Sequence, residues 1–172
     1  NLHKTYIKFI KTKIDKEPGK YKTPYPKIIL STHSPNILKY VIRLFKDKQQ
    51  IIHFSNHKNK GTQVHKLNSK YKDHRFLNVF SDNEARLFFS NFILFVEGAT
   101  ELEVFRNYKL CEKFPALDLI DIYETNEVTL KYLNPNYSRA AIPFLILNDA
   151  DVLIKFDYAN SKLTLCSSKH NF

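Results

Sequence analysis

The feature that most constrains the fold is an alternation of apolar runs and helix-like segments from residue 91 onward. The runs "FILFV" and "FLIL" are continuously apolar, which is typical of strands covered on both faces. Between them lie a helical pattern from about Thr100 to Phe114, the strand-like run "LDLIDIYE" and the short helical segment "EVTLKYL". Strands that alternate with helices indicate βαβ units and a parallel sheet. An α/β fold class is therefore predicted.

Acidic residues end two of these apolar runs. Glu97 follows "FILFV", and Asp149 and Asp151 follow "FLIL". Ligands of an open parallel sheet bind at the carboxyl ends of its strands, so the three carboxylates converge if the two strands are neighbours. A spacing of two residues lets both aspartates point the same way on an extended chain. Carboxylates gathered in this way repel one another unless a cation neutralises them, and such oxygen ligands select Mg²⁺ or Mn²⁺.

The residues after Glu97 predict a tight turn and a helix start. Gly98 allows close backbone geometry, and Thr100 is the expected N-cap, with Glu103 completing a capping box. Glu101 would then lie in the first helical turn. Two interpretations of Glu101 stay open: a favourable interaction with the helix dipole, and a second metal ligand one turn away from Glu97.

The first part of the chain predicts three helices, a hairpin and a short buried strand. The helices are expected over residues 4–14, where the pattern is amphipathic, over 36–46, with Ser34 or Asn36 as cap, and over 81–91, with a capping box of Ser81 and Glu84. A connector rich in proline covers 15–26, Ile28–Leu30 is the expected buried strand, and two strands are expected over 49–67 around a turn at Gly61.

Charge is divided unevenly along the chain. The net charge is +10, but residues 1–75 carry 18 Lys and Arg against 4 Asp and Glu, a balance of +14. Residues 76–172 carry 9 against 13, a balance of −4. This asymmetry favours two functional regions with the basic one contacting nucleic acid. A lysine-rich composition without functional meaning explains the same counts equally well.

Composition narrows the class of protein. The 172 residues are 43% hydrophobic and 26% charged, which is ordinary for a globular chain. Cys111 and Cys166 form no CxxC pair, so no disulfide framework or zinc site is predicted. No apolar stretch reaches the length of a membrane span and no signal peptide opens the chain, which makes the cytoplasm the expected location. The absence of methionine indicates a piece of a longer protein.

Together, "FVEGATE" and the later "LILNDAD" resemble the Toprim domain of topoisomerases, primases and nucleases. The resemblance covers roughly residues 90–160 and implies a Rossmann-like parallel sheet that binds divalent metal. It places Glu97 at the family's glutamate and Asp149 and Asp151 at its DxD pair. Glu101 matches the additional acidic residue of the "EGxTE" form, so the implied metal ligands are Glu97, Glu101, Asp149 and Asp151.

The segment "IILSTHSPNIL" resembles the switch-histidine region of ABC-type and RecF-like ATPases. The resemblance implies that His33 reaches the γ-phosphate of ATP, while an ordinary strand-end histidine is the simpler interpretation. The sequence departs from that family because its three glycines, Gly19, Gly61 and Gly98, cannot form a P-loop. No apolar run ending in Asp-Glu precedes His33 either. These 172 residues alone are therefore not expected to hydrolyse ATP.

An ATPase tail followed by a Toprim domain resembles the OLD (overcoming lysogenization defect) family of nucleases, including Gabija and retron-associated anti-phage effectors. The resemblance implies an ATPase lobe over residues 1–75, a connecting helix over 76–90 and a C-terminally incomplete Toprim domain over 91–172. It further implies a DNA endonuclease with two Mg²⁺ or Mn²⁺ ions, with Glu97, Asp149, Asp151 and His33 as the catalytic set. ATP in the complete protein, a homodimer or higher oligomer through the ATPase, and a defence partner such as a reverse transcriptase with its RNA–DNA are implied as well.

Two alternatives to the nuclease stay in view. A non-catalytic DNA-binding or ATPase-accessory module could keep the Toprim fold as a scaffold. A Toprim primase or topoisomerase would need a zinc motif or a tyrosine domain, and the sequence shows no zinc motif. The OLD resemblance also implies a catalytic basic residue after the DxD pair, for which Lys155, Lys162 and Lys169 are candidates unless it lies beyond residue 172.

Overall fold

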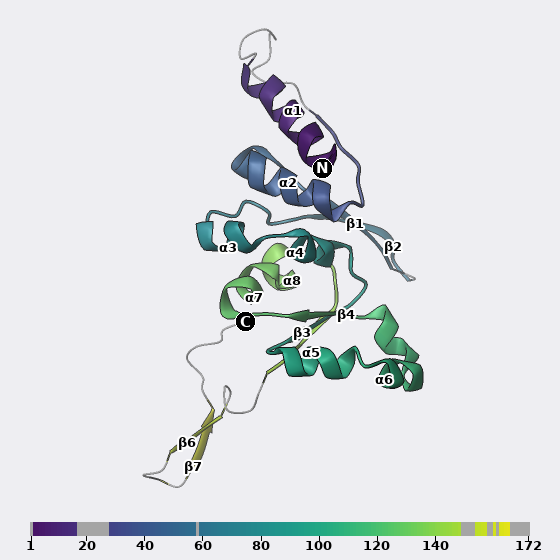
Figure 1. The fold of residues 1–172 in the computed structure, drawn as a ribbon, viewed down its shortest axis with the longest axis vertical. Helices are drawn as coiled ribbons and strands as arrows, with labels where there is room; N and C mark the ends of the chain where they lie inside the picture. The colour runs from purple at the N-terminus through teal and green to yellow at the C-terminus, as the bar shows by residue number, and fades with distance from the viewer. Residues whose placement is uncertain are drawn as a thin grey trace. The chain divides into compact units, whose positions relative to one another are not determined.

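The chain is a mixed α/β protein that divides into two compact units. Figure 1 shows the computed structural model, which describes residues 2–16, 28–57, 59–148, 154–157, 160 and 162–165. The first unit comprises Asn1–Ser90 together with Tyr132–Ala141, and the second comprises Asn91–Lys131 together with Ile142–Phe172. The first division falls where the Toprim resemblance was expected to begin. The assignment of Tyr132–Ala141 to the first unit was not predicted.

The elements of the first unit are mainly helical. They are α1 (Leu2–Lys16), α2 (Pro35–Phe45), η1 (Lys46–Lys48), β1 (Ile52–His57), β2 (Gly61–Lys66), α3 (His74–Val79), α4 (Asp82–Arg86), η2 (Leu87–Phe89) and α8 (Pro135–Ser138). The second unit holds β3 (Ile93–Val96), α5 (Ala99–Phe105), α6 (Tyr108–Lys113), η3 (Pro115–Leu119), β4 (Asp121–Glu124), β5 (Phe144–Leu147), β6 (Ile154–Asp157) and β7 (Lys162–Leu165). Helix α7 (Glu127–Leu133) begins in the second unit and ends in the first.

Both predicted N-terminal helices are confirmed, and they pack against each other (Figure 1). Ile7 of α1 and Ile42 of α2 are buried, each only 1% exposed. Ser34 is the N-cap of α2, and Pro35 follows at the first helical position, where its missing N–H costs no hydrogen bond. The Ser34 side chain makes no capping bond; instead the Ser34 backbone N–H donates to Thr32 Oγ1 at 3.0 Å.

The predicted buried strand at Ile28–Leu30 is wrong. These residues form no strand, and the Ile29 side chain is 97% exposed. A strand is stabilised when a neighbouring strand satisfies its backbone N–H and C=O groups. None of the described strands pairs with this segment, so its apolar composition alone does not produce a strand. The predicted connector at residues 15–26 lies almost entirely outside the described residues.

An aromatic cluster forms the core of the first unit. It includes residues of Tyr132–Ala141, the later segment of the chain that belongs to this unit. Its members are Tyr71, Phe76, Phe80, Tyr132 and Tyr137. Phe76 is fully buried, and its ring centroid lies 4.6 Å from that of Tyr71 and 4.8 Å from that of Tyr132. Burial raises the pKa of the Tyr71 hydroxyl, and the neighbouring Tyr137 contributes to the rise. The hydroxyl therefore stays protonated within the cluster.

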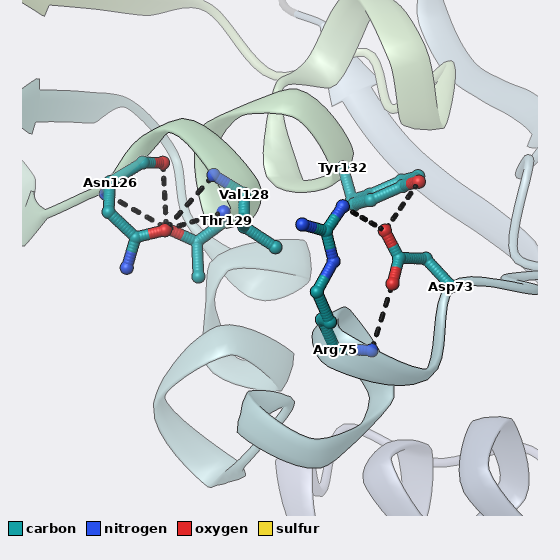
Figure 2. A network of polar contacts seen from close by, with 6 residues as sticks. All are labelled: Asp73, Arg75, Asn126, Val128, Thr129 and Tyr132. Atoms are coloured by element: carbon teal, nitrogen blue, oxygen red, sulfur yellow. Dashed lines mark hydrogen bonds and ion pairs between the residues drawn. The ribbon is translucent and has the colours of Figure 1, made fainter.

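Asp73 ties the start of α3 to the end of α7 (Figure 2). Its Oδ1 accepts from the Arg75 backbone N–H at 2.8 Å, and its Oδ2 accepts from the Tyr132 hydroxyl at 3.2 Å and the Arg75 guanidinium at 3.4 Å. Burial tends to raise the pKa of the Asp73 carboxyl, but the hydrogen bonds from Arg75 and Tyr132 outweigh it and lower the pKa. The ionised carboxylate thus caps α3 and orients Tyr132.

A three-stranded parallel sheet organises the second unit, as the sequence predicts. The strand order is β4-β3-β5, and both neighbours of β3 run parallel to it. One face of the sheet carries Leu94, Val96 and Ile122, which pack under Leu102 and Phe105 of α5. Figure 1 shows α5 running alongside β3. All residues of β3 are buried, as expected for a strand covered on both faces.

The expectation that β5 is also covered on both faces is wrong. Burial alternates along β5, and Leu145 and Leu147 are 57% and 39% exposed. These two residues share the sheet face of Leu94 and Val96, because they are their register partners. Helix α5 packs on β3 and β4, which leaves that face of β5 open in the described part of the chain.

The predicted helix from Thr100 to Phe114 is broken into α5 and α6. The break lies at Arg106 and Asn107. Asn107 is the N-cap of α6, and its side chain accepts from the backbone N–H groups of Lys109 and Leu110. Asparagine competes for backbone hydrogen bonds in this way, so it favours a helix start over a helix interior. The periodicity of apolar residues continues across the break and conceals it.

After β5, the structure contains more strands than the sequence predicts. The segment "IPFLILNDADVLI" contributes to two strands: β5 ends at Leu147, and a separate strand, β6, begins at Ile154. Strand β6 pairs antiparallel with β7, which lies where the sequence pattern was too weak to predict a strand. Among the described residues, no helix has the length and apolar character needed to cross a membrane.

Candidate functional site

The carboxyl ends of β3, β4 and β5 meet at one edge of the sheet. Val96, the last residue of β3, is in register with Glu124 of β4 on one side and Leu147 of β5 on the other. The backbone N–H of Thr125 donates to the Val96 carbonyl at 3.0 Å and extends the contact beyond the strand end. Glu97 and Asn148 are the residues that follow β3 and β5 at this edge. Asn148, the residue before Asp149 in the sequence, therefore lies at the same edge as Glu97.

Glu97 lies at the junction between β3 and α5, and its side chain is exposed. Gly98 follows as the N-cap of α5. A carboxylate at the carboxyl end of a central parallel strand stands where ligands of such sheets bind. The predicted position of Glu97 at a strand end is confirmed, while metal binding by this residue stays a prediction.

The predicted cap of α5 is wrong by two residues. Gly98 is the N-cap, not Thr100, and Glu101 completes the capping box in place of Glu103. Glu101 Oε2 accepts from the Gly98 backbone N–H at 3.1 Å. A Cβ atom at position 98 would lie 3.1 Å from the same Oε2 atom, so glycine gives Glu101 room to turn back. Glu101 therefore has a structural role, and one carboxylate oxygen is engaged in it.

Replacing Glu101 separates its capping role from metal binding. We expect Glu101→Ala to lower the free energy of unfolding by about 0.5–2 kcal/mol, because the Gly98 N–H loses its acceptor. Glu101→Gln is the matched control: glutamine also completes capping boxes but is not a negatively charged ligand. Urea unfolding of both variants measures the first effect. A Gln variant as unstable as the Ala variant would contradict the capping role.

The two aspartates of the predicted metal site lie outside the described residues. Asp149 and Asp151 follow Asn148, the last residue described before Ile154. Within the described ranges, no group of three or more His, Cys, Asp or Glu side chains is placed to hold a metal ion. Of the predicted ligands, the structure thus places only Glu97, which precedes the N-cap of α5, and Glu101, which lies in the first turn of that helix. Their convergence with the DxD pair stays a prediction.

One acidic residue at this edge was missed by sequence reasoning. Glu124 ends β4, is exposed and is the register partner of Val96. The signal was present in the sequence, because "LDLIDIYE" is an apolar run that ends in a glutamate just as "FILFVE" does. Three carboxylates, on Glu97, Glu101 and Glu124, therefore belong to the described part of the edge.

A hydrogen-bond network fixes the chain where it leaves this edge after β4 (Figure 2). Asn126 Oδ1 accepts from the backbone N–H groups of Val128 and Thr129 at 3.1 Å and 3.0 Å. The buried Thr129 hydroxyl lies 2.9 Å from the Thr125 hydroxyl. These bonds start α7 directly after the sheet, so the backbone around Glu124 is held in place.

The remaining predicted site residues occupy other parts of the chain. His33 lies in the first unit, is exposed and immediately precedes the N-cap of α2. It follows an irregular segment and not the core strand that a switch histidine would follow. Lys155 lies in β6 and Lys162 in β7, while Lys169 is outside the described residues. A role for any of these lysines stays a prediction.

Comparison with known proteins adds no assignment. No protein-family model matches the sequence, and no solved structure matches the chain. The functional interpretation therefore depends on the residues at the sheet edge and on the sequence motifs.

Proposed function

We propose that this chain belongs to a metal-dependent DNA endonuclease of the OLD type, with a Toprim domain controlled by an ABC-type ATPase. The observation that carries the proposal is the register of β3 and β5. These strands are parallel neighbours, and Val96 and Leu147 pair at their carboxyl ends. Glu97 is the first residue after β3, and the "NDAD" segment begins directly after β5. This is the neighbour relationship that the metal-site prediction required.

The chemistry of these side chains suits Mg²⁺ or Mn²⁺. Carboxylate oxygens are the preferred ligands of both ions. Glu97 and the Asp149 and Asp151 pair would hold the ions, with Glu101 contributing the carboxylate oxygen that does not bond to Gly98. Two such ions, when bound, activate the attacking water and stabilise the leaving oxygen of a phosphodiester. The protein side chains thus supply position and negative charge.

Basic and aromatic residues of the first unit support DNA as the substrate. Helix α1 exposes Lys4 and Lys8 and also the rings of Tyr6 and Phe9, which are 49% and 57% exposed. Lysines neutralise backbone phosphates, and exposed rings can stack on unpaired bases. This arrangement matches the excess of positive charge over residues 1–75.

The ATPase part of the proposal depends on the resemblance around His33. The His33 side chain is exposed ahead of α2, which leaves it open to a nucleotide phosphate. The proposal also includes ATP binding and a homodimer or higher oligomer through the ATPase. It further includes a cytoplasmic location and a role in anti-phage defence with a reverse transcriptase as partner.

Plasmid cleavage by the full-length protein in Mg²⁺ or Mn²⁺ tests the proposed nuclease. We expect Asp149→Ala and Asp151→Ala each to abolish cleavage, because each removes a metal ligand. Asp118→Ala is the matched control, since Asp118 is an exposed aspartate of η3 in the same unit. Circular dichroism checks that each variant is folded. Cleavage that survives both substitutions would reject the metal site, and a parent protein that binds DNA without cutting it would favour a scaffold module.

A further inference from the structure

The hairpin of β1 and β2 turns its polar face inward. The strands pair antiparallel, with His53 opposite His65 and Phe54 opposite Val64. Side chains alternate between the two faces of such a hairpin. Phe54 and Val64 are 65% and 59% exposed, while His53, Ser55 and His65 are only half-exposed. Burial of apolar area alone would favour the opposite arrangement, so the polar face needs another explanation.

Three polar atoms on this inward face are buried, and no residue in the described part of the chain gives them a hydrogen-bond partner. They are His53 Nδ1, Ser55 Oγ and His65 Nε2. Buried polar atoms in proteins are nearly always paired, because an unpaired one loses the hydrogen bonds it made to water. Three such atoms on one face of a single hairpin are therefore unusual. A group that bonds to imidazole nitrogen, such as a metal ion, would satisfy the two histidine nitrogens.

The two histidines are placed to share one ligand. Directly opposed residues of an antiparallel pair have Cβ atoms roughly 4.5–5.5 Å apart, and their side chains extend from the same face. Two imidazoles at that separation can both reach a single ion. A neutral imidazole nitrogen has a lone pair that can bind a metal.

We propose that His53 and His65 form a binding site for a divalent transition metal ion of the imidazole-binding class, with Zn²⁺ as its representative. Imidazole suits Zn²⁺, Ni²⁺ and Cu²⁺, whereas Mg²⁺ takes oxygen ligands. The site is therefore chemically distinct from the carboxylates at the sheet edge and does not rest on the proposed nuclease. Water completes the coordination, and Ser55 Oγ, two residues along β1 on the same face, could hydrogen bond to such a water.

Zinc titration of the metal-free full-length protein tests this site. Calorimetry in excess Mg²⁺, which occupies oxygen-ligand sites, measures the stoichiometry and affinity for Zn²⁺. NMR of the histidine ring C–H groups identifies whether His53 and His65 are the histidines that bind. We expect one Zn²⁺ per chain and shifts of two ring systems. His53→Gln and His65→Gln should each weaken Zn²⁺ binding at least about tenfold. Removing a residue that only supports a metal ligand already costs about tenfold or more in affinity, and removing the ligand itself should cost no less.

His74→Gln is the matched control, because His74 is exposed at the start of α3. It should leave the affinity for Zn²⁺ unchanged. Zinc affinity that is equal in the parent and in both hairpin variants would overturn the proposal, as would a parent protein whose histidine signals do not shift. The ring signals of the parent report the ligands directly, so the test stands even if a variant fails to fold. Loss of plasmid cleavage is not a readout of this site.

Discussion

Alanine in place of Glu97 is expected to reduce metal-dependent DNA cleavage by the full-length protein at least about a hundredfold, which corresponds to about 2.7 kcal/mol of transition-state stabilisation. Glu97 follows the central strand, β3, whose end is in register with the ends of both neighbours. No other described residue of the predicted metal set extends directly from a strand end. Its loss would remove negative charge from the place where the metal is proposed to bind.

Glu103→Ala is the control for this prediction. Glu103 is an exposed residue of α5 that was predicted to form the capping box but does not. It carries the same charge as Glu97 but lies within α5 and not at the end of β3, and its loss should leave cleavage within about twofold of the parent. Initial rates of plasmid nicking at saturating Mn²⁺ compare the variants. Equal losses in Glu97→Ala and Glu103→Ala would mean that the edge contributes only general negative charge, and the proposed metal ligand would be rejected.

Phe76→Ala is expected to destabilise the first unit by about 3–5 kcal/mol, the usual cost of deleting a buried aromatic ring. Phe76 is 0% exposed and contacts the rings of Tyr71, Phe80 and Tyr132. Net stabilities of natural domains are about 5–15 kcal/mol, so this single change removes a large share. It also removes the ring contact with Tyr132, through which the segment Tyr132–Ala141 joins the cluster.

Val79→Ala on the same helix provides the comparison. Val79 is 48% exposed, so truncating it removes little buried area and should cost less than about 1 kcal/mol. Urea unfolding followed by near-ultraviolet circular dichroism reports on the tyrosine and phenylalanine rings. A Phe76→Ala variant as stable as Val79→Ala would show that the cluster rearranges to fill the space.

The elements predicted correctly are those with strong local signals. The capping box of Ser81 and Glu84 forms as expected at the start of α4. Gly61, around which the hairpin turn was predicted, is the first residue of β2 and the register partner of His57, and its φ of 64° favours glycine. Neighbouring residues provide these signals within a few positions of the chain, so tertiary contacts are not needed to recognise them.

Two of the wrong predictions share a different property. Ile28–Leu30 has the composition of a buried strand, yet Ile29 is exposed because no described strand pairs with the segment. Burial of β5 was likewise inferred from its apolar run, but α5 packs on other strands of the sheet. The pairing of a strand and the covering of its faces depend on segments that are distant in the sequence. A local pattern contains no information about whether those segments pack there.

By itself, the sequence determined the kinds of local element and the acidic residue at the end of β3, because hydrophobic periodicity, caps and turns act over a few residues. Only the tertiary structure decided that β3 and β5 are neighbours and that Tyr132 joins the aromatic core of the first unit. It also decided which face of the hairpin turns inward and left His53 and His65 together there. These outcomes depend on the competition of whole surfaces for burial, and that competition is settled only when the chain packs.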